Sequence, residues 1–324
     1  MSDTNAPPDA NGLRLIRFFQ LNGRRMTLAA RKLGVTGRSL VIGIPFAWLL
    51  LFFVVPFVIV LKISFATQII GIPPYTDLMD WSGGGWWPTF NIDTYNYEFL
   101  LSDSLYTVAY LTSLKIAVVS TFLCLLVAYP MAYGIARTSP RYRNIFLLLI
   151  ILPFWTSFLL RVYSWMGILK YNGLLNNFLI WTGIISDPLP MLHNDFSVYL
   201  GIVYSYLPFM LLPLYANLER MDKSLLEAAA DLGASKTRAF FTVTVPLSIP
   251  GVIAGSLLVF IPAVGEFVIP SLLGGTSTLM IGRVLWDEFF QNTAWPVASA
   301  VAIVMLLILV VPIMVFQRFQ MRED

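Results

Sequence analysis

Charged residues are scarce in this chain: they make up 12% of its 324 residues, about half of the roughly 25% found in ordinary soluble domains. There is one cysteine and one histidine, so neither an internal disulfide nor a metal site of clustered cysteines or paired histidines can form. The sequence contains no Gly-Lys dipeptide, which excludes a GxxxxGK[ST] phosphate loop. A net charge of +3 is too small to indicate a nucleic-acid partner. These absences argue against a soluble enzyme, and we expect no catalytic residue, metal or cofactor in this chain.

Apolar residues, in contrast, make up 57% of the sequence. A membrane-spanning helix needs about 20 mainly apolar residues, and long stretches of this kind recur along the chain. The predicted fold class is therefore an all-α integral membrane protein with about six transmembrane helices. The predicted spans are 41–61, 116–136, 144–160, 196–218, 239–265 (continuing apolar through Glu266 to residue 281) and 289–317.

Lysine and arginine predict the orientation of these spans, because cytosolic segments carry an excess of them. With the N-terminus in the cytosol, 16 of the 21 cations fall in cytosolic segments and only Lys62, Lys170 and Arg283 fall outside. We therefore expect both termini to face the cytosol, with a basic tail at residues 1–39 and a short tail at 318–324.

The segment between the fourth and fifth spans carries a pronounced helix signal. Ser224 and Glu227 have the S-x-x-E spacing of a capping box, and Gly233 stands where a left-handed residue ends a helix. A second short helix, capped by Ser235, is expected to run to Pro246. A helix of about eight residues is marginal by itself in water, so another surface is expected to pack on it.

This segment, residues 219–246, resembles the EAA loop of ABC importer permeases. The residues Glu227-Ala228-Ala229, Gly233 and Val243-Thr244-Val245-Pro246 match the pattern EAA-x3-G-x9-I-x-L-P, with valine in place of isoleucine and of leucine. The resemblance implies a coupling helix that sits in a groove of a cytosolic ATPase. The resemblance also implies which residues form the ATPase-coupling loop: Glu227, Ala228, Ala229, Gly233 and Pro246.

Further segments resemble the permease subunits of bacterial putrescine importers. They include Leu152-Pro153-Phe154-Trp155-Thr156-Ser157 and the stretch from Phe260 to Pro270. The resemblance implies a type I importer of the bacterial inner membrane: two homologous permease subunits, two copies of an ATPase that uses ATP, and a periplasmic polyamine-binding protein. Residues 40–104 would then be the first transmembrane helix with an outer loop, and residues 105–317 the permease core.

Three ionisable residues fall within predicted spans: Lys115, Arg161 and Glu266. A charge at the centre of a span costs about 2.5–3.5 kcal/mol, so such residues normally face a cavity or a partner. For a diammonium substrate, Glu266 could line the pathway, with Phe154, Trp155 and Tyr163 as aromatic walls. The alternative is that Glu266 forms a structural salt bridge, for example with Arg161.

Two other functions remain as alternatives. Within the same class, the substrate could be spermidine, or a mixture of polyamines. In a different class, an ion-coupled secondary transporter could use Glu266 as its carrier site, but it would have no need of a coupling loop.

Overall fold

The computed structural model describes residues 37–80, 89–276 and 278–320, and within these residues the chain is mostly helical. The described residues divide into two units, with the boundary between Val60 and Leu61. The basic N-terminal tail therefore lies mostly outside the described residues.

Five helical segments are long and apolar enough to cross a membrane, or six if one bent pair counts as a single span. The first consists of α2 (Gly37–Leu49), a π-helical turn η1 (Leu50–Val54) and α3 (Val55–Ser64). The others are α5 (Ser104–Arg137), α9 (Asp195–Arg220), a composite helix from Lys236 to Val264, and α15 (Trp295–Gln320). The predicted class and approximate number of spans are confirmed.

The predicted third span is not a single straight helix. α6 (Pro140–Ile151) and the 3-10 turn η2 (Leu152–Trp155) form one arm, and α7 (Phe158–Leu169) with α8 (Leu174–Trp181) forms the other, bent by 91°. The break falls at Thr156 and Ser157, whose backbones are extended, and the Thr156 hydroxyl donates to the Pro153 carbonyl at 2.7 Å. Pro153, and then the two hydroxyl residues at 156 and 157, interrupt the helix inside an apolar stretch, which hydropathy alone cannot detect.

The predicted fifth span is a single helix, but the apolar stretch that follows it is divided. The short helix α11 (Lys236–Ala239), the π-helical turn η3 (Phe240–Thr244) and α12 (Val245–Val264) form one continuous helix. The expectation that the second loop helix ends at Pro246 is therefore wrong, because the helix continues through this proline, which directly follows the π-helical turn η3. After Gly265 the chain leaves the helix and begins α13 (Val268–Leu272).

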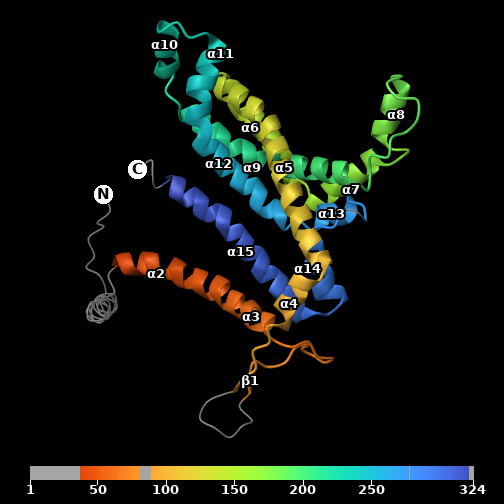
Figure 1. Ribbon diagram of the computed structural model, residues 1–324. Coiled ribbons are helices and arrows are strands. Elements are labelled where there is room, and N and C mark those ends of the chain that lie inside the picture. Colours follow the sequence, from red (N-terminus) through yellow and green to blue (C-terminus); the bar gives the residue numbers. More distant parts are fainter. Residues whose placement is uncertain (1–36, 81–88, 277, 321–324) are drawn as a thin grey trace, which may run out of the picture. The chain divides into compact units, whose positions relative to one another are not determined.

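The remaining elements are short. β1 (Met79–Asp80) pairs antiparallel with β2 (Thr89–Phe90), and α4 (Tyr95–Ser102) precedes α5. α14 (Ile281–Trp286) and the π-helical turn η4 (Asp287–Gln291) lead into α15. α10 (Ser224–Asp231) connects α9 to α11. In Figure 1, α10 and α4 lie at opposite ends of the long helix α5.

The core of the second unit forms along α5, which contributes to three buried clusters. Small residues of α5 face the core: Ala109, Ala117, Ala128 and Ala132 are all fully buried. On α12, a β-carbon at Gly255 would lie 2.8 Å from the backbone oxygen of Met210 on α9. Close contact through small residues is typical of helix packing in membranes, where van der Waals contact rather than the hydrophobic effect holds helices together.

Candidate functional site: the interspan loop and the intramembrane charges

The interspan loop contains the predicted eight-residue helix, α10, but its N-terminal cap differs from the expected one. Ser224 is the first helical residue, and its backbone N–H donates to Asp222 Oδ1 at 2.9 Å. This hydrogen bond lowers the pKa of Asp222. The capping box built on Ser224 is therefore wrong, since the acceptor lies two residues earlier; an aspartate before a helix start is an equally good cap.

The end of α10 follows the prediction. Gly233 has φ +80°, the left-handed conformation that favours glycine, and its N–H donates to Ala230 O at 2.9 Å. Ser235 Oγ then accepts from Arg238 N at 3.3 Å and caps α11, also as predicted.

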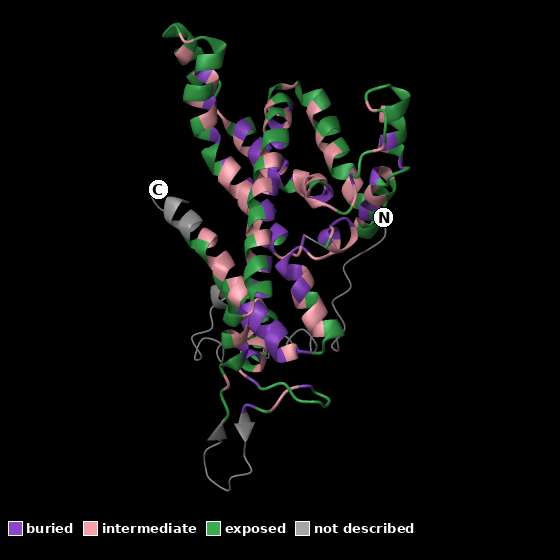
Figure 2. Cartoon of the chain, turned by 45° about the vertical axis from the view of Figure 1, so that its right-hand side comes forward, coloured by how far each residue is buried: buried purple, intermediate pink, exposed green. Residues whose placement is uncertain are grey.

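None of the residues of α10 is buried. In Figure 2, the part of the fold that carries α10 and α11 is mostly exposed. Leu225 and Leu232, from the predicted apolar face, are 44% and 89% exposed. Glu227 and Ala228 are exposed, and Ala229 is half-buried. The described residues therefore leave the apolar face of α10 open.

A cavity of about 510 Å³ lies behind α10, between the ends of α5, α6 and α9. Arg137, Arg143, Glu219, Lys223 and Glu227 contribute its charged lining. The Arg143 guanidinium pairs with the Glu219 carboxylate and also donates to Ala136 O at 3.1 Å. Arg143 thus joins the ends of α5, α6 and α9 on the side from which α10 emerges.

This arrangement suits the transmission of motion. Only three residues separate α9 from α10, and α11 continues through η3 into α12. Because α9 and α12 pack on each other and on α5, a displacement of α10 would act on the centre of the helix bundle. Within the described residues, no group of three or more histidine, cysteine or acidic side chains could hold a metal ion.

Glu266 is 7% exposed, and both of its carboxylate oxygens are occupied. Oε1 accepts from the backbone N–H of Val268 at 3.0 Å and of Ile269 at 3.3 Å, while Oε2 accepts from the Tyr206 hydroxyl. These bonds hold the break between α12 and α13.

Arg161 is also buried, at 9% exposure, but it does not pair with Glu266: it takes part in none of the ion pairs of the described chain. The expected salt bridge is therefore not formed. Its guanidinium lies over the ring of Phe154, 4.6 Å from the centroid. Phe154 contacts Phe209, and Phe209 contacts Tyr206, so a row of aromatic rings connects Arg161 to Glu266. The other two aromatic candidates, Trp155 and Tyr163, are 77% and 53% exposed.

Lys115 pairs with an acid that the sequence reasoning did not use. Its Nζ lies 3.5 Å from Oδ2 of Asp195, the first residue of α9. The signal available in the sequence was a lysine inside one span and an aspartate at the start of another; only the packing of α5 against α9 brings them together.

The sequence matches the family described as "Binding-protein-dependent transport system inner membrane component" over residues 125–319. This chain belongs to that family. Its members are membrane components of transport systems, in agreement with the non-catalytic subunit expected from the sequence. The match covers the core from the middle of α5 to the end of α15.

Two curated relatives extend the match. The "Spermidine/putrescine transport system permease protein PotB" of Haemophilus influenzae is 39% identical over 281 residues, which cover 87% of this chain and 93% of the relative. The protein of the same name from Escherichia coli is 38% identical over 84% of this chain and 93% of the relative.

Solved structures support the fold. A bacterial ABC transporter involved in the import of the acidic polysaccharide alginate has a chain with a TM-score of 0.60 at 17% identity, covering 93% of this chain and 99% of that one. The alginate transporter in complex with a pentasaccharide-bound periplasmic protein has a TM-score of 0.65 at 16% identity. At these identities the likeness concerns the fold alone.

Proposed function

We propose that this family member is the permease subunit of an ATP-driven importer for polyamines, with putrescine as the expected substrate. The observation that carries the proposal is the identity of 39% and 38% to two relatives named for spermidine and putrescine, over more than four fifths of the chain. Because their names include both substrates, spermidine, alone or together with putrescine, is the alternative.

We further propose that α10 is the coupling helix. Glu227, Ala228 and Ala229 would contact a groove of the ATPase, Gly233 would end the helix in the required conformation, and Pro246 would begin α12. Two observations support this role. The apolar face of α10 is open, and its short connections lead directly into two packed core helices.

The assembly that follows contains a second homologous permease subunit, two copies of the ATPase and a periplasmic polyamine-binding protein. The family description names dependence on a binding protein. We place both termini and α10 in the cytosol of a bacterium, because the segments around α10 and the N-terminal tail hold most of the lysine and arginine.

The decisive experiment uses proteoliposomes that contain this chain with its sister permease and ATPase. We expect uptake of radiolabelled putrescine that requires both ATP and the binding protein. Parallel uptake of labelled spermidine measures the preference between the two substrates. Uptake by this chain alone, driven by an ion gradient, would contradict the proposal and favour a secondary transporter.

The coupling role is tested by Gly233→Asp, which places a side chain at φ +80° and a charge against the ATPase. We expect ATP-dependent uptake to be lost while the permease pair still assembles. Gly183 provides a matched control, because it also has positive φ, +73°, but lies after α8, far along the chain from the loop. Equal loss in Gly183→Asp would indicate a folding defect rather than uncoupling.

For the pathway, Glu266, Phe154, Trp155 and Tyr163 remain our candidates. Glu266→Gln keeps the shape of the side chain and removes its charge. A pathway role predicts loss of uptake from a normally assembled complex, whereas unchanged uptake would assign Glu266 to the α12–α13 break alone. Trp155→Ala and Tyr163→Ala test the exposed aromatic rings in the same assay, and Phe154→Leu tests the packed one.

A further inference from the structure

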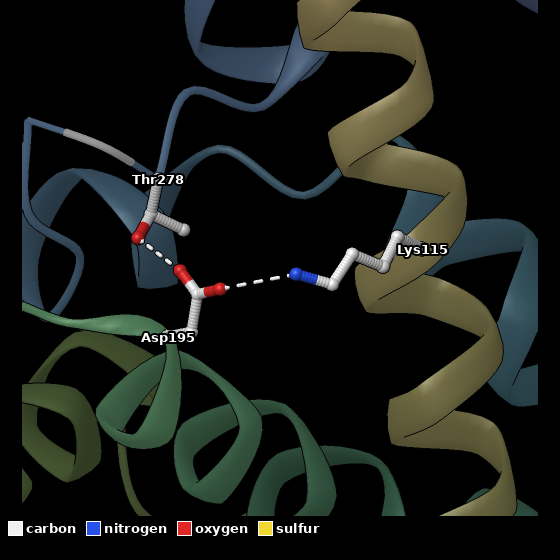
Figure 3. A network of polar contacts seen from close by, with 3 residues as sticks. All are labelled: Lys115, Asp195 and Thr278. Carbon is white, nitrogen blue, oxygen red and sulfur yellow. Dashed lines mark hydrogen bonds and ion pairs between the residues drawn. The ribbon is translucent and has the colours of Figure 1, made fainter.

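Lys115, Asp195 and Thr278 form a polar contact between three separate elements (Figure 3). Asp195 Oδ2 lies 3.5 Å from Lys115 Nζ on α5, and Asp195 Oδ1 accepts from the Thr278 hydroxyl at 2.6 Å. Thr278 precedes α14. The carboxylate at the start of α9 is thus held at one oxygen by a hydroxyl and at the other by an ammonium.

The surroundings of this contact are firmly positioned. The backbone N–H of Ile281 donates to Ser113 Oγ on α5 at 2.8 Å. The Ser197 hydroxyl and the backbone N–H of His193 both donate to Leu273 O, at 2.7 and 2.9 Å. The segment that carries Thr278 is therefore fastened to α5 on one side and to the start of α9 on the other.

The pair is nevertheless open: the Lys115 side chain is 63% exposed and that of Asp195 is 40% exposed. Lys115 lies well inside α5, a candidate span, where a charge is expected to face a cavity or a partner. Glu266 is the opposite case, because it is 7% exposed and bonded at both oxygens within the chain. Of these two acids, Asp195 is the one whose carboxylate the described residues leave partly exposed.

The chemistry of Lys115 suggests which solute. A lysine side chain is four methylene groups ending in a primary ammonium, which is the chemistry of one end of an alkyl diamine. We propose that Asp195 binds a terminal ammonium of the transported polyamine, and that Lys115 occupies the same carboxylate oxygen while the substrate is absent. This inference rests on the proposed function.

Replacing the Lys115 ammonium by the substrate ammonium at Asp195 has a physical advantage inside a membrane protein. An unpaired charge there is costly, so a carboxylate without a counter-ion would destabilise the empty transporter. Exchange of one ammonium for another keeps Asp195 paired throughout, while the displaced Lys115 ammonium loses its partner, and this cost limits how tightly the substrate is held. Thr278 keeps the carboxylate in place during the exchange.

The test measures equilibrium binding of radiolabelled putrescine to the complex of this chain with its sister permease and ATPase, without the binding protein. Asp195→Asn removes the charge-assisted contact, and we expect its Kd to rise by about tenfold to a hundredfold. Lys115→Met removes the competitor and keeps the length of the side chain, so we expect its Kd to fall by about threefold or more. These opposite shifts are the signature of the exchange.

The control is the outer ion pair Lys62–Asp77, whose Nζ and Oδ1 lie 3.8 Å apart. Lys62→Met and Asp77→Asn should leave the Kd for putrescine unchanged. A purely structural Lys115–Asp195 pair would behave differently: both single variants would lower the yield of assembled complex, and the swap Lys115→Asp with Asp195→Lys would restore it together with putrescine binding. That result would overturn the inference.

Failure of the inference and failure of the proposed function give different results. Saturable ATP-dependent polyamine uptake by the wild-type complex, with a Kd that Asp195→Asn leaves unchanged, would overturn only the role of Asp195. The role of Asp195 would also be overturned if neither the wild-type complex nor Lys115→Met showed saturable putrescine binding. No uptake of any polyamine by the wild-type complex would contradict the proposed function itself.

Discussion

The α9–α12 pair and the α10 helix both contain leucines, but they place them in opposite surroundings. Leu211 and Leu214 on α9 are fully buried, and glycines on α12 allow the two helices to approach closely. On α10 no residue is buried. The first region is packed within the chain, whereas the second presents an apolar face that none of the residues described by the structure covers. We infer that α9 and α12 determine stability, while α10 determines what the stable unit can be coupled to.

The same substitution placed in both regions should give the largest contrast. Leu218, at the end of α9, is 5% exposed, and Leu232, just after α10, is 89% exposed. Leu218→Asp buries a charge without a partner, and we expect it to cost on the order of 4 kcal/mol or more. Leu232→Asp should leave the unfolding of the permease pair unchanged and abolish ATPase coupling. Thermal unfolding in detergent and ATP-dependent uptake measure the two effects; a destabilised Leu232→Asp would break the comparison.

Close packing within the core predicts the next largest effect. A β-carbon at Gly255 would lie 2.8 Å from Met210 O and 2.9 Å from Met210 Sδ, so Gly255→Val should force α9 and α12 apart at a cost of roughly 3 kcal/mol. Gly134 on α5 has no atom within 4 Å of such a β-carbon. Gly134→Val is therefore the control and should unfold close to the wild-type temperature. Equal unfolding temperatures for both variants would show that the α9–α12 contact is not tightly packed.

A hydrogen bond inside the core predicts a moderate effect. Tyr206→Phe removes the hydroxyl that donates to Glu266 Oε2, and a bond to a charged group contributes about 1.5–3 kcal/mol. Tyr204, on the same helix, packs on Trp165, and its hydroxyl takes part in none of the hydrogen bonds found among the described residues. Tyr204→Phe should therefore cost less than Tyr206→Phe when the two are compared by thermal unfolding. A larger cost for Tyr204→Phe than for Tyr206→Phe would mean that the Tyr206 hydroxyl does not hold Glu266 in place.

The start of α10 predicts the smallest effect, and one that depends on pH. The Ser224 N–H lowers the pKa of Asp222 below its ordinary value of 3.8, so the bond stabilises the helix start fully above that value. This stabilisation is lost as the pH falls through the lowered pKa. Asp222→Ala should increase hydrogen exchange at the first amides of α10 at neutral pH. The difference from wild type should vanish in acid; a difference that persists there would mean that the carboxylate charge is not responsible.

The candidate site was predictable where its determinants are local. The helix of the interspan loop ends at Gly233 as its spacing indicates, because only a left-handed residue closes the helix there. The side chain that accepts at its start was misassigned, since Asp222 and Ser224 can both accept such a hydrogen bond and spacing alone favoured the serine. The partner of Glu266 was also misassigned: charge favoured Arg161, but the fold places Tyr206 and two backbone amides around the carboxylate.

The sequence by itself determined that this chain crosses a membrane and carries a short helix in the loop between two spans. Apolar length and helix caps act over one or a few turns, so they can be recognised without the fold. Only the tertiary structure decided where the third span bends, and that Asp195 contacts both Lys115 and Thr278. Those two contacts join residues about 80 positions apart, and they depend on how α5, α9 and the segment before α14 pack together. Packing of that kind is not encoded in any single stretch of the chain.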